Sequence, residues 1–439
     1  MLHISNIKSA FLKALVASLL FILTYMFYNS EIIRSNIEDI SFDIVNKFAI
    51  NKISTDTNTS QVMIFAIDDL YMKENHLYDE YNKTNYGYLF PRDHISKFIE
   101  SLDELCSEVD SANLPKALFI DYDMSFTSLP YGKKLSIEDQ KLLDILKKER
   151  PYKILLPKTS YYNFIENSKD KDIQNLINNG KLIFVSVAML QSSDGISRRY
   201  QSYKSFRYDK NTTKTYIGLG SALWQLMHEK DINLTEAKKN FAKDDIISNR
   251  IWIKSYQNYQ EDDGCSTQKS YWEKLTKYSA NCSLFDIVEE DFAKSIIMLG
   301  GTYTQNDDVF NILNVLSSDS FSGIDMHANA LMTMLYLNGG MKRLSLVKSF
   351  IVVFLSFFIL SVFISTIFSL LKIYNDEVEF IVLLVLNTLV LISISIYLLL
   401  VHQLWFNWFV PLVLFELVEI FDYIKDFLPK IISKLRRKK

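Results

Sequence analysis

Pairs of aspartates follow two of the apolar segments that the sequence predicts as strands. Asp68 and Asp69 come directly after residues 61–67. Asp121 and Asp123 follow the next such segment along the chain. Ligands of open α/β sheets bind beyond the carboxyl ends of the strands, so neighbouring strands would bring these carboxylates together to hold a cation or a polar ligand. The alternative is structural, because aspartate also caps helices and stabilises turns where a strand gives way to a helix.

Two further residues extend this candidate ligand-binding site. Asp308 follows the pair Gly300-Gly301, which lacks the further glycines or the lysine of nucleotide-binding loops and therefore indicates a tight turn. His327 lies in a predicted helix, where a lone histidine is more often a hydrogen-bonded structural residue. The sequence has no Ser-His-Asp arrangement with an elbow motif, no His-Glu-x-x-His and no Cys-x-x-Cys. We therefore expect no metal, no cofactor and no enzymatic activity. Of three functional hypotheses, an enzyme that acts through the acidic cluster is the least favoured.

The composition separates lipid-like ends from a middle that looks soluble. The 439 residues could hold two or three domains. The formal net charge of −3 argues against a nucleic-acid partner, which would require a basic face. The dense basic cluster is the extreme C-terminus, residues 434–439.

Four apolar segments are predicted to be transmembrane helices: residues 11–28, 350–371, 380–401 and 404–420. For the first segment an uncleaved anchor is favoured over a signal peptide, because no small-residue cleavage site follows it. Lys13 can snorkel to the interface, Trp405 and Trp408 mark an interface between the last two spans, and Pro411 can kink the fourth.

An even number of spans places both termini on one side of the membrane, and the lysines near the N-terminus and the basic tail assign that side to the cytoplasm. The lipid bilayer is thus one expected partner, in a bacterial inner membrane with a large periplasmic domain. We expect an anchor over 1–30, a periplasmic domain over 31–345, three transmembrane helices over 346–421 and a cytoplasmic tail over 422–439.

The middle of the chain alternates short apolar strands with helices, which predicts an α/β fold with a mixed, partly parallel sheet flanked by helices. Predicted strands are residues 61–67, 116–120, 152–156, 181–187, 250–254 and 295–299, and predicted helices start at Pro91 and cover 137–149, 216–229 and 325–337. Residues 73–88 and 261–277 look like surface excursions.

The three cysteines lack metal-ligand spacing. In a periplasmic domain Cys265 and Cys282 could form a disulfide that closes a short loop, with Cys106 as the odd thiol. Spacing alone does not establish the pairing, so both states remain open at this point.

Eight stretches, in this order, resemble the CHASE type-2 sensor domain, the extracytoplasmic domain associated with cyclases and histidine kinases. They are Glu38–Asp43, Ala66–Asp69, Phe90–His94, Ala117–Asp123, Asp194–Arg199, Ile297–Gly300, Asp308–Phe310 and Gly323–Ala330. The third stretch, Phe90–His94, resembles the proline-arginine-x-histidine turn of the family and adds Arg92 to the candidate ligand-binding residues. The sequence departs from the family pattern at Leu89-Phe90, where the family has tryptophan-proline, and at 311–313, where the family's proline is absent.

The resemblance implies a periplasmic sensor, three helices after it, and an output domain that this chain is expected to lack, since about nineteen residues follow the last helix. The leading hypothesis is therefore a sensor or receptor subunit that binds a small ligand or a protein and acts through a separate partner. The alternative is a scaffold subunit of a membrane complex, whose aromatic-rich domain makes protein contacts. Either hypothesis requires protein partners in the periplasm or inner membrane, and a homo-oligomer is compatible with both.

Overall fold

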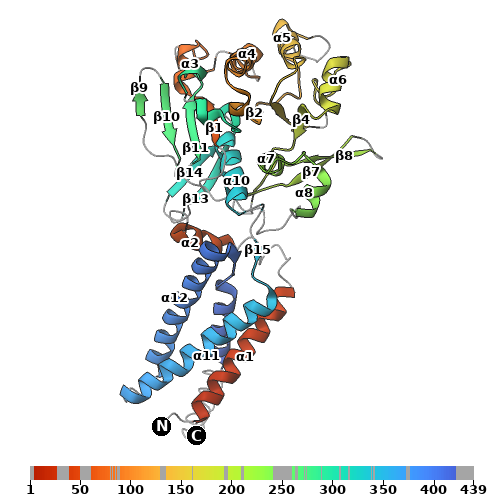
Figure 1. The fold of residues 1–439 in the computed structure, drawn as a ribbon. Coiled ribbons are helices and arrows are strands. Elements are labelled where there is room, and N and C mark those ends of the chain that lie inside the picture. Colours follow the sequence, from red (N-terminus) through yellow and green to blue (C-terminus); the bar gives the residue numbers. More distant parts are fainter. Residues whose placement is uncertain are drawn as a thin grey trace, which may run out of the picture. The chain divides into compact units, whose positions relative to one another are not determined.

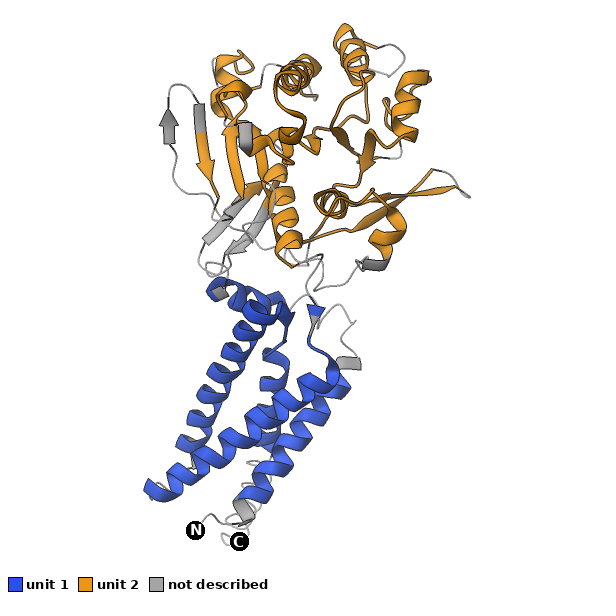
Figure 2. Cartoon of the chain, in the orientation of Figure 1, with its two compact units in different colours: residues 1–52, 342–439 blue, residues 53–341 orange. Residues whose placement is uncertain are grey.

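The computed structural model divides the chain into two compact units (Figure 2). Unit 1 combines residues 1–52 with 342–439, and unit 2 is residues 53–341. The structure describes the chain except for residues 1–3, 27–38, 50–60, 80, 82, 85, 87–88, 129–134, 161, 192–195, 209–211, 241–259, 263–264, 271, 273, 288, 306–307, 315–316, 338, 340–341, 372–375 and 422–439.

Unit 2 is built on a sheet with the strand order β4-β3-β2-β12-β1-β11-β10-β9 (Figure 1). Each neighbouring pair from β4 to β11 is parallel. β10 runs antiparallel to β11 on one side and to β9 on the other. The strands are β1 (Val62–Ile67), β2 (Ala117–Asp121), β3 (Lys153–Pro157), β4 (Leu182–Val185), β9 (Gln260–Asp262), β10 (Cys265–Lys269), β11 (Leu275–Ser279) and β12 (Ile296–Gly301). The predicted α/β class with a partly parallel sheet is confirmed, whereas the predicted strand at 250–254 lies outside the described residues.

Two central strands are apolar along their whole length because both faces of the sheet are covered. All residues of β1 and β12 are buried. Parallel strands covered by helices on both faces read as continuous apolar runs in this way. The region 261–277, predicted as a surface excursion, instead supplies β10 and the start of β11, whose Leu275 and Thr276 are buried beside β1.

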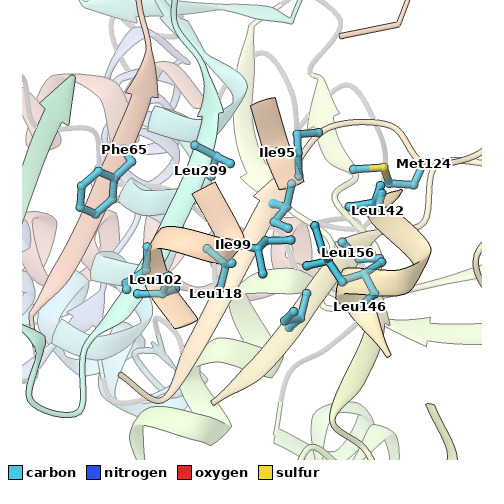
Figure 3. Packing of buried hydrophobic residues seen from close by; sticks show 14 of the residues in the cluster. Phe65, Ile95, Ile99, Leu102, Leu118, Met124, Leu142, Leu146, Leu156 and Leu299 are labelled. Carbon is cyan, nitrogen blue, oxygen red and sulfur yellow. The ribbon is translucent and has the colours of Figure 1, made fainter. Parts of the chain in front are cut away.

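Alternate strand residues sort the core into two layers. Phe65, Leu118, Leu156 and Leu299 belong to one hydrophobic cluster with residues of α4 (Arg92–Glu108), α5 (Ile137–Leu146) and α6 (Lys171–Asn178) (Figure 3). In α4 the buried Ile95, Ile99, Leu102 and Leu105 recur at helical spacing, as the sequence predicts. The opposite face of β1 and β12 packs against α10 (Gly323–Tyr336), which also contacts α7 (Leu219–Met227).

The rest of unit 2 consists of hairpins and short helices. The hairpins are β5 (Met189–Gln191) with β6 (Ser197–Tyr200), β7 (Tyr203–Arg207) with β8 (Thr213–Ile217), and β13 (Val309–Asn314) with β14 (Ser317–Ser322). The short helices are α3 (Asp69–Glu74), α8 (Leu234–Asn240) and α9 (Glu289–Phe292), with single turns at Ser111–Asn113 and Leu284–Asp286.

The sequence left a disulfide between Cys265 and Cys282 open, and the structure supports it at one of these two cysteines. Cys282 is disulfide-bonded and Cys106 is a free thiol. The remaining cysteine of the sequence is Cys265, whose side chain lies outside the described part. Cys106 is the odd thiol, and burial raises its pKa to about 12, so it is a poor nucleophile.

Among its described residues, unit 1 has three helices that are long and apolar enough to cross a membrane. They are α1 (Ile4–Met26), α11 (Leu346–Leu371) and α12 (Asp376–His402), and their candidate spans are Ile7–Thr24, Leu346–Leu371 and Val378–His402. Ala10, Ala14 and Ala17 are buried along α1, which packs against α11. Small residues let helix backbones approach closely in a lipid environment, where apolar side chains gain little by avoiding lipid.

The predicted fourth span, 404–420, is helical only in part. Leu404–Trp405 forms β16, parallel to β15 (Lys342–Arg343), and described helical residues run from 409 to 421. Asn407 explains the helix start, because its Oδ1 accepts hydrogen bonds from the backbone N of Phe409 at 3.0 Å and Val410 at 3.3 Å. Pro411 therefore lies in the first turn, where proline is tolerated, and not at a kink within a long span.

Three residues predicted to lie at membrane interfaces have protein partners inside unit 1. Trp408 Nε1 donates to the backbone O of Ser41 at 3.1 Å, in α2 (Asp39–Ala49). Lys13 Nζ lies 2.7 Å from Glu419 Oε2, and so ties α1 to the helical residues 409–421. Trp405 likewise packs its ring against Phe42 of α2, with ring centroids 5.1 Å apart.

Candidate functional site

A polar pocket of about 240 Å³ lies at the carboxyl ends of β1 and β11. Its polar lining residues are Asp68, Asp69, Gln268, Lys277, Ser279 and Thr302. Three parallel strands, β11, β1 and β12, end here side by side, so the residues that follow them are neighbours. Asp68 and Thr302, for example, both line the pocket although they are 234 positions apart in the sequence. This is the location at which open α/β sheets bind ligands.

Asp68 begins α3 and lines the pocket. Its Oδ1 accepts hydrogen bonds from the backbone N of Tyr71 at 2.9 Å and from Ser279 Oγ at 3.0 Å. The first bond is an N-cap, which is the structural role that the sequence offers as the alternative. The cap uses one carboxylate oxygen, and the other remains for a second role.

Asp69 is held rigidly in its ionised form. It accepts hydrogen bonds from the Tyr78 hydroxyl, from the Thr304 hydroxyl and from the Thr304 backbone N at 3.0 Å. Burial alone would raise the pKa of Asp69, but these hydrogen bonds and the charge of Lys73 outweigh it and lower the pKa. Asp69 thus contributes a fixed negative charge to the pocket wall.

Lys277 is the cation among the described pocket-lining residues, and it is already paired. Its Nζ lies 3.2 and 3.1 Å from the two carboxylate oxygens of Asp325, at the start of α10. The side chains of Lys277 and Asp325 are 15% and 7% exposed, so this ion pair is shielded from water. The Gln268 amide and the Thr302 hydroxyl, by contrast, make no hydrogen bond within the described part of the chain.

Asp121 and His327 form a second group, on the face of the sheet that α10 covers. His327 Nε2 lies 3.9 Å from Asp121 Oδ1, and the two side chains are 5% and 8% exposed. Burial, together with the nearby charge of Asp308, raises the pKa of Asp121 well above its usual value. Burial lowers the pKa of His327 to about 3, so both groups favour their neutral forms and the contact is polar rather than ionic.

Asp308 joins this second group through α10 and not through the pocket. Its backbone O accepts a hydrogen bond from Gly323 N at 2.8 Å. A Cβ at Gly323 would lie 1.7 Å from Asp308 Oδ2, so the approach of the carboxylate requires glycine there.

Arg92 and Asp123 form a third group with a structural role. The fully buried Arg92 donates from Nη2 to the backbone O of Asp123 at 2.7 Å. Asp123 Oδ1 accepts from Ser125 N and Thr159 Oγ1, both at 2.8 Å. Burial lowers the pKa of Arg92, and the neighbouring acidic groups oppose this. Arg92 therefore fastens the loop after β2 to the start of α4.

The seven candidate residues thus divide among three places. Asp68 and Asp69 line the pocket, Asp121, Asp308 and His327 lie at α10, and Arg92 and Asp123 lie at the loop after β2. Within the described ranges no group of three His, Cys, Asp or Glu residues could hold a metal ion. Gln268 and Lys277 were missed, because β10 and β11 are more polar than the strands that an apolar pattern detects. Thr302 was missed although it directly follows the predicted strand β12.

A buried charged network at the end of β3 was also missed. Lys158 has a fully buried side chain that pairs with Glu166, and Glu166 also accepts from Lys214 Nζ and the Tyr216 hydroxyl, each at 2.6 Å. These contacts tie the β7–β8 hairpin to the sheet, and the lysine directly after an apolar strand was the signal that could have revealed them. A lysine is buried in this way only when its charge is matched.

No family model, no curated protein and no solved structure matches this chain. What the chain does has to be inferred from its own fold, its apolar helices and the pocket.

Proposed function

We propose that this chain is a membrane-anchored sensor whose unit 2 binds a small polar ligand in the pocket at the ends of β1 and β11. The pocket is the observation that carries the proposal. It has about 240 Å³ and lies at the carboxyl ends of parallel strands, where open sheets bind ligands. Some of its hydrogen-bonding groups have no protein partner among the described residues. That volume is below the usual range for drug-sized ligands, so it suits a small metabolite.

The arrangement of the chain supports a signalling role. Unit 2 lies in the sequence between α1 and α11, two helices that could cross a membrane and that pack against each other. A ligand that changes the conformation of unit 2 at its two chain ends can therefore act on this packed pair of helices. A separate partner protein would then transmit the signal. The resemblance to CHASE type-2 sensor domains implies the same role.

We place unit 2 in the periplasm and the chain in a bacterial inner membrane. Disulfides persist in oxidising compartments, and Cys282 is disulfide-bonded. The basic residues 434–439 suit the cytoplasmic side of a membrane segment. Accessibility labelling of a cysteine introduced at exposed Ser205 tests this placement, because a membrane-impermeant maleimide should label it in intact spheroplasts.

The sensor proposal is tested by ligand-induced stabilisation of the full-length protein in detergent. A ligand of the folded state raises the unfolding midpoint in proportion to its concentration over Kd. Screening small metabolites should give at least one that stabilises the wild type and fails with Gln268→Leu. Thr213→Val, at an exposed position of β8 far along the sequence from the pocket, is the control. If no metabolite stabilises the protein at millimolar concentration, the sensor proposal is wrong.

A scaffold role is the second candidate, and one observation favours it. A groove of about 630 Å³ between α4 and α5 is bordered by Ile137, which is 91% exposed, and by Leu135, which is 40% exposed. Exposed apolar side chains beside a groove are typical of protein contacts. Purification from membranes should then recover a stoichiometric complex that Ile137→Asp disrupts and Gln268→Leu leaves intact. If the chain is a sensor, Gln268→Leu should abolish ligand-induced stabilisation and Ile137→Asp should leave it intact.

A further inference from the structure

The charges around the pocket are unequal. Of its three charged lining residues, Lys277 is bound to both oxygens of Asp325, whereas Asp68 and Asp69 have no cation in direct contact among the described residues. An anionic ligand would have to approach two carboxylates while the nearest ammonium is already engaged. A cationic ligand would complete the charge balance of the pocket.

The hydrogen bonds point to the same class of ligand. Both donors to Asp68 bind Oδ1, so Oδ2 has no hydrogen bond among the described residues. The Thr302 hydroxyl and the Gln268 side-chain carbonyl add two acceptors without a partner there. A protonated primary amine has three N–H donors and no acceptor, so it matches a charged oxygen with two neutral oxygens beside it. Its bond to a carboxylate is also the stronger, charge-assisted kind.

We propose that the pocket binds its ligand through a protonated primary amine, which Asp68 Oδ2 holds and to which Thr302 and Gln268 contribute further acceptors. This inference rests on the proposed sensor function and names the chemical class of its ligand. Asp69 supplies a second negative charge, but Tyr78 and Thr304 already donate hydrogen bonds to its two oxygens, whereas Asp68 Oδ2 accepts none among the described residues. Asp68 is therefore the residue that distinguishes an amine from an uncharged ligand.

The experiment compares ligands that differ only in charge. Full-length protein in detergent at pH 7 and constant ionic strength is titrated with ethanolamine, ethylene glycol and glycolate, followed by a panel of primary amines and their N-acetyl counterparts. Stabilisation by the amines, with none by the acetylated compounds, is the expected result. If N-acetyl amines or glycolate stabilise as well as the amines do, the amine proposal is overturned while the sensor function stands. If no compound of any charge stabilises, the sensor function itself has failed.

The decisive variant is Asp68→Asn. Asparagine caps helices as well as aspartate does, so Tyr71 N and Ser279 Oγ keep an acceptor while the charge is removed. We expect amine affinity to fall about ten-fold or more, because a hydrogen bond to a charged group is lost. Asp170→Asn, the same substitution at the N-cap of α6, is the matched control and should leave amine affinity unchanged. Wild-type amine affinity in Asp68→Asn, with an unchanged unfolding midpoint, would overturn the proposal.

Discussion

Asp68 at the end of β1 and Asp121 at the end of β2 follow similar apolar strands, yet they lie in opposite environments. Asp68 caps α3 and keeps one oxygen for the pocket. Asp121 is the last residue of its strand, and its side chain lies beneath α10, where burial raises its pKa. Asp121 lies within the sheet, level with Gly300 of β12 and Ala66 of β1, whereas Asp68 lies two positions beyond that level, past the end of β1. The same local pattern therefore produces an open polar edge in one case and a neutral buried contact in the other.

The largest expected effect concerns the buried surroundings of Asp121, between the sheet and α10. Gly300 of β12 lies between the two strand ends, and a Cβ there would lie 2.8 Å from Ile324 Cβ and 3.1 Å from Asp121 Cβ. Gly300→Val should lower the free energy of unfolding by about 2 to 3 kcal/mol, because it pushes α10 away from the sheet. Thermal unfolding in detergent measures this. Gly180→Asn, at a position with φ of +65° and open space around it, is the control.

The second prediction uses pH to report on the buried histidine. The pKa of His327 is about 3 when folded and 6.5 as a free side chain. The unfolded chain therefore binds more protons between these values, and wild-type stability should fall as pH drops from 6.5 towards 3. His327→Gln should remove about 1.4 kcal/mol per pH unit from that slope. An identical slope in wild type and variant would contradict the burial of a neutral histidine.

The third prediction makes the same substitution at both strand ends. Asp121 has a raised pKa when folded, so its contribution to stability is complete below about pH 4 and is lost as pH rises. Asp121→Asn should therefore gain stability relative to wild type as pH is raised from 4 to 8, and it should not alter ligand binding. Asp68→Asn should alter ligand binding alone. Unfolding midpoints across pH and ligand titrations of both variants test this contrast, and a loss of binding in Asp121→Asn would break it.

The smallest expected effect concerns the hydrogen bond between Ser279 and Asp68 at the edge of the pocket. Ser279→Ala removes one hydrogen bond to Asp68 Oδ1 and should cost about 1 kcal/mol of stability. The helix cap from Tyr71 N remains, so α3 should stay formed. A double-mutant cycle with Asp68→Asn gives the coupling between the two side chains. Additive effects would mean that the Ser279 hydroxyl does not support the carboxylate.

The sequence pattern predicted the apolar strands well and the polar ones poorly. Residues 61–67, 116–120, 152–156 and 295–299 closely match β1, β2, β3 and β12. β11 was missed because Thr276 and Lys277 interrupt its apolar run, although the strand lies directly beside β1. Lys277 can occupy that position because Asp325, 48 residues away, neutralises it, and no local pattern contains that information.

The membrane helices show the same limit. Hydropathy predicted three spans that the structure contains, since apolar length is a property of the local chain. The start of the last helix depended on Asn407 as a cap, and the partner of Lys13 was a glutamate 406 residues away. Both details were outside the reach of a hydropathy argument, because they depend on single polar contacts.

The α/β class, the apolar helices at both ends and the aspartates at strand ends follow from local features of the sequence, namely periodicity, apolar length and strand-end composition. Which aspartates meet depends instead on how distant strands pair. The insertion of β12 between β1 and β2, and of β11 at the other side of β1, joins segments that are more than 170 residues apart in the chain. Those pairings placed Asp68 in a pocket with Gln268 and Thr302 and placed Asp121 against His327. Strand order and strand register, which are both non-local, therefore separated a pocket edge from a buried contact.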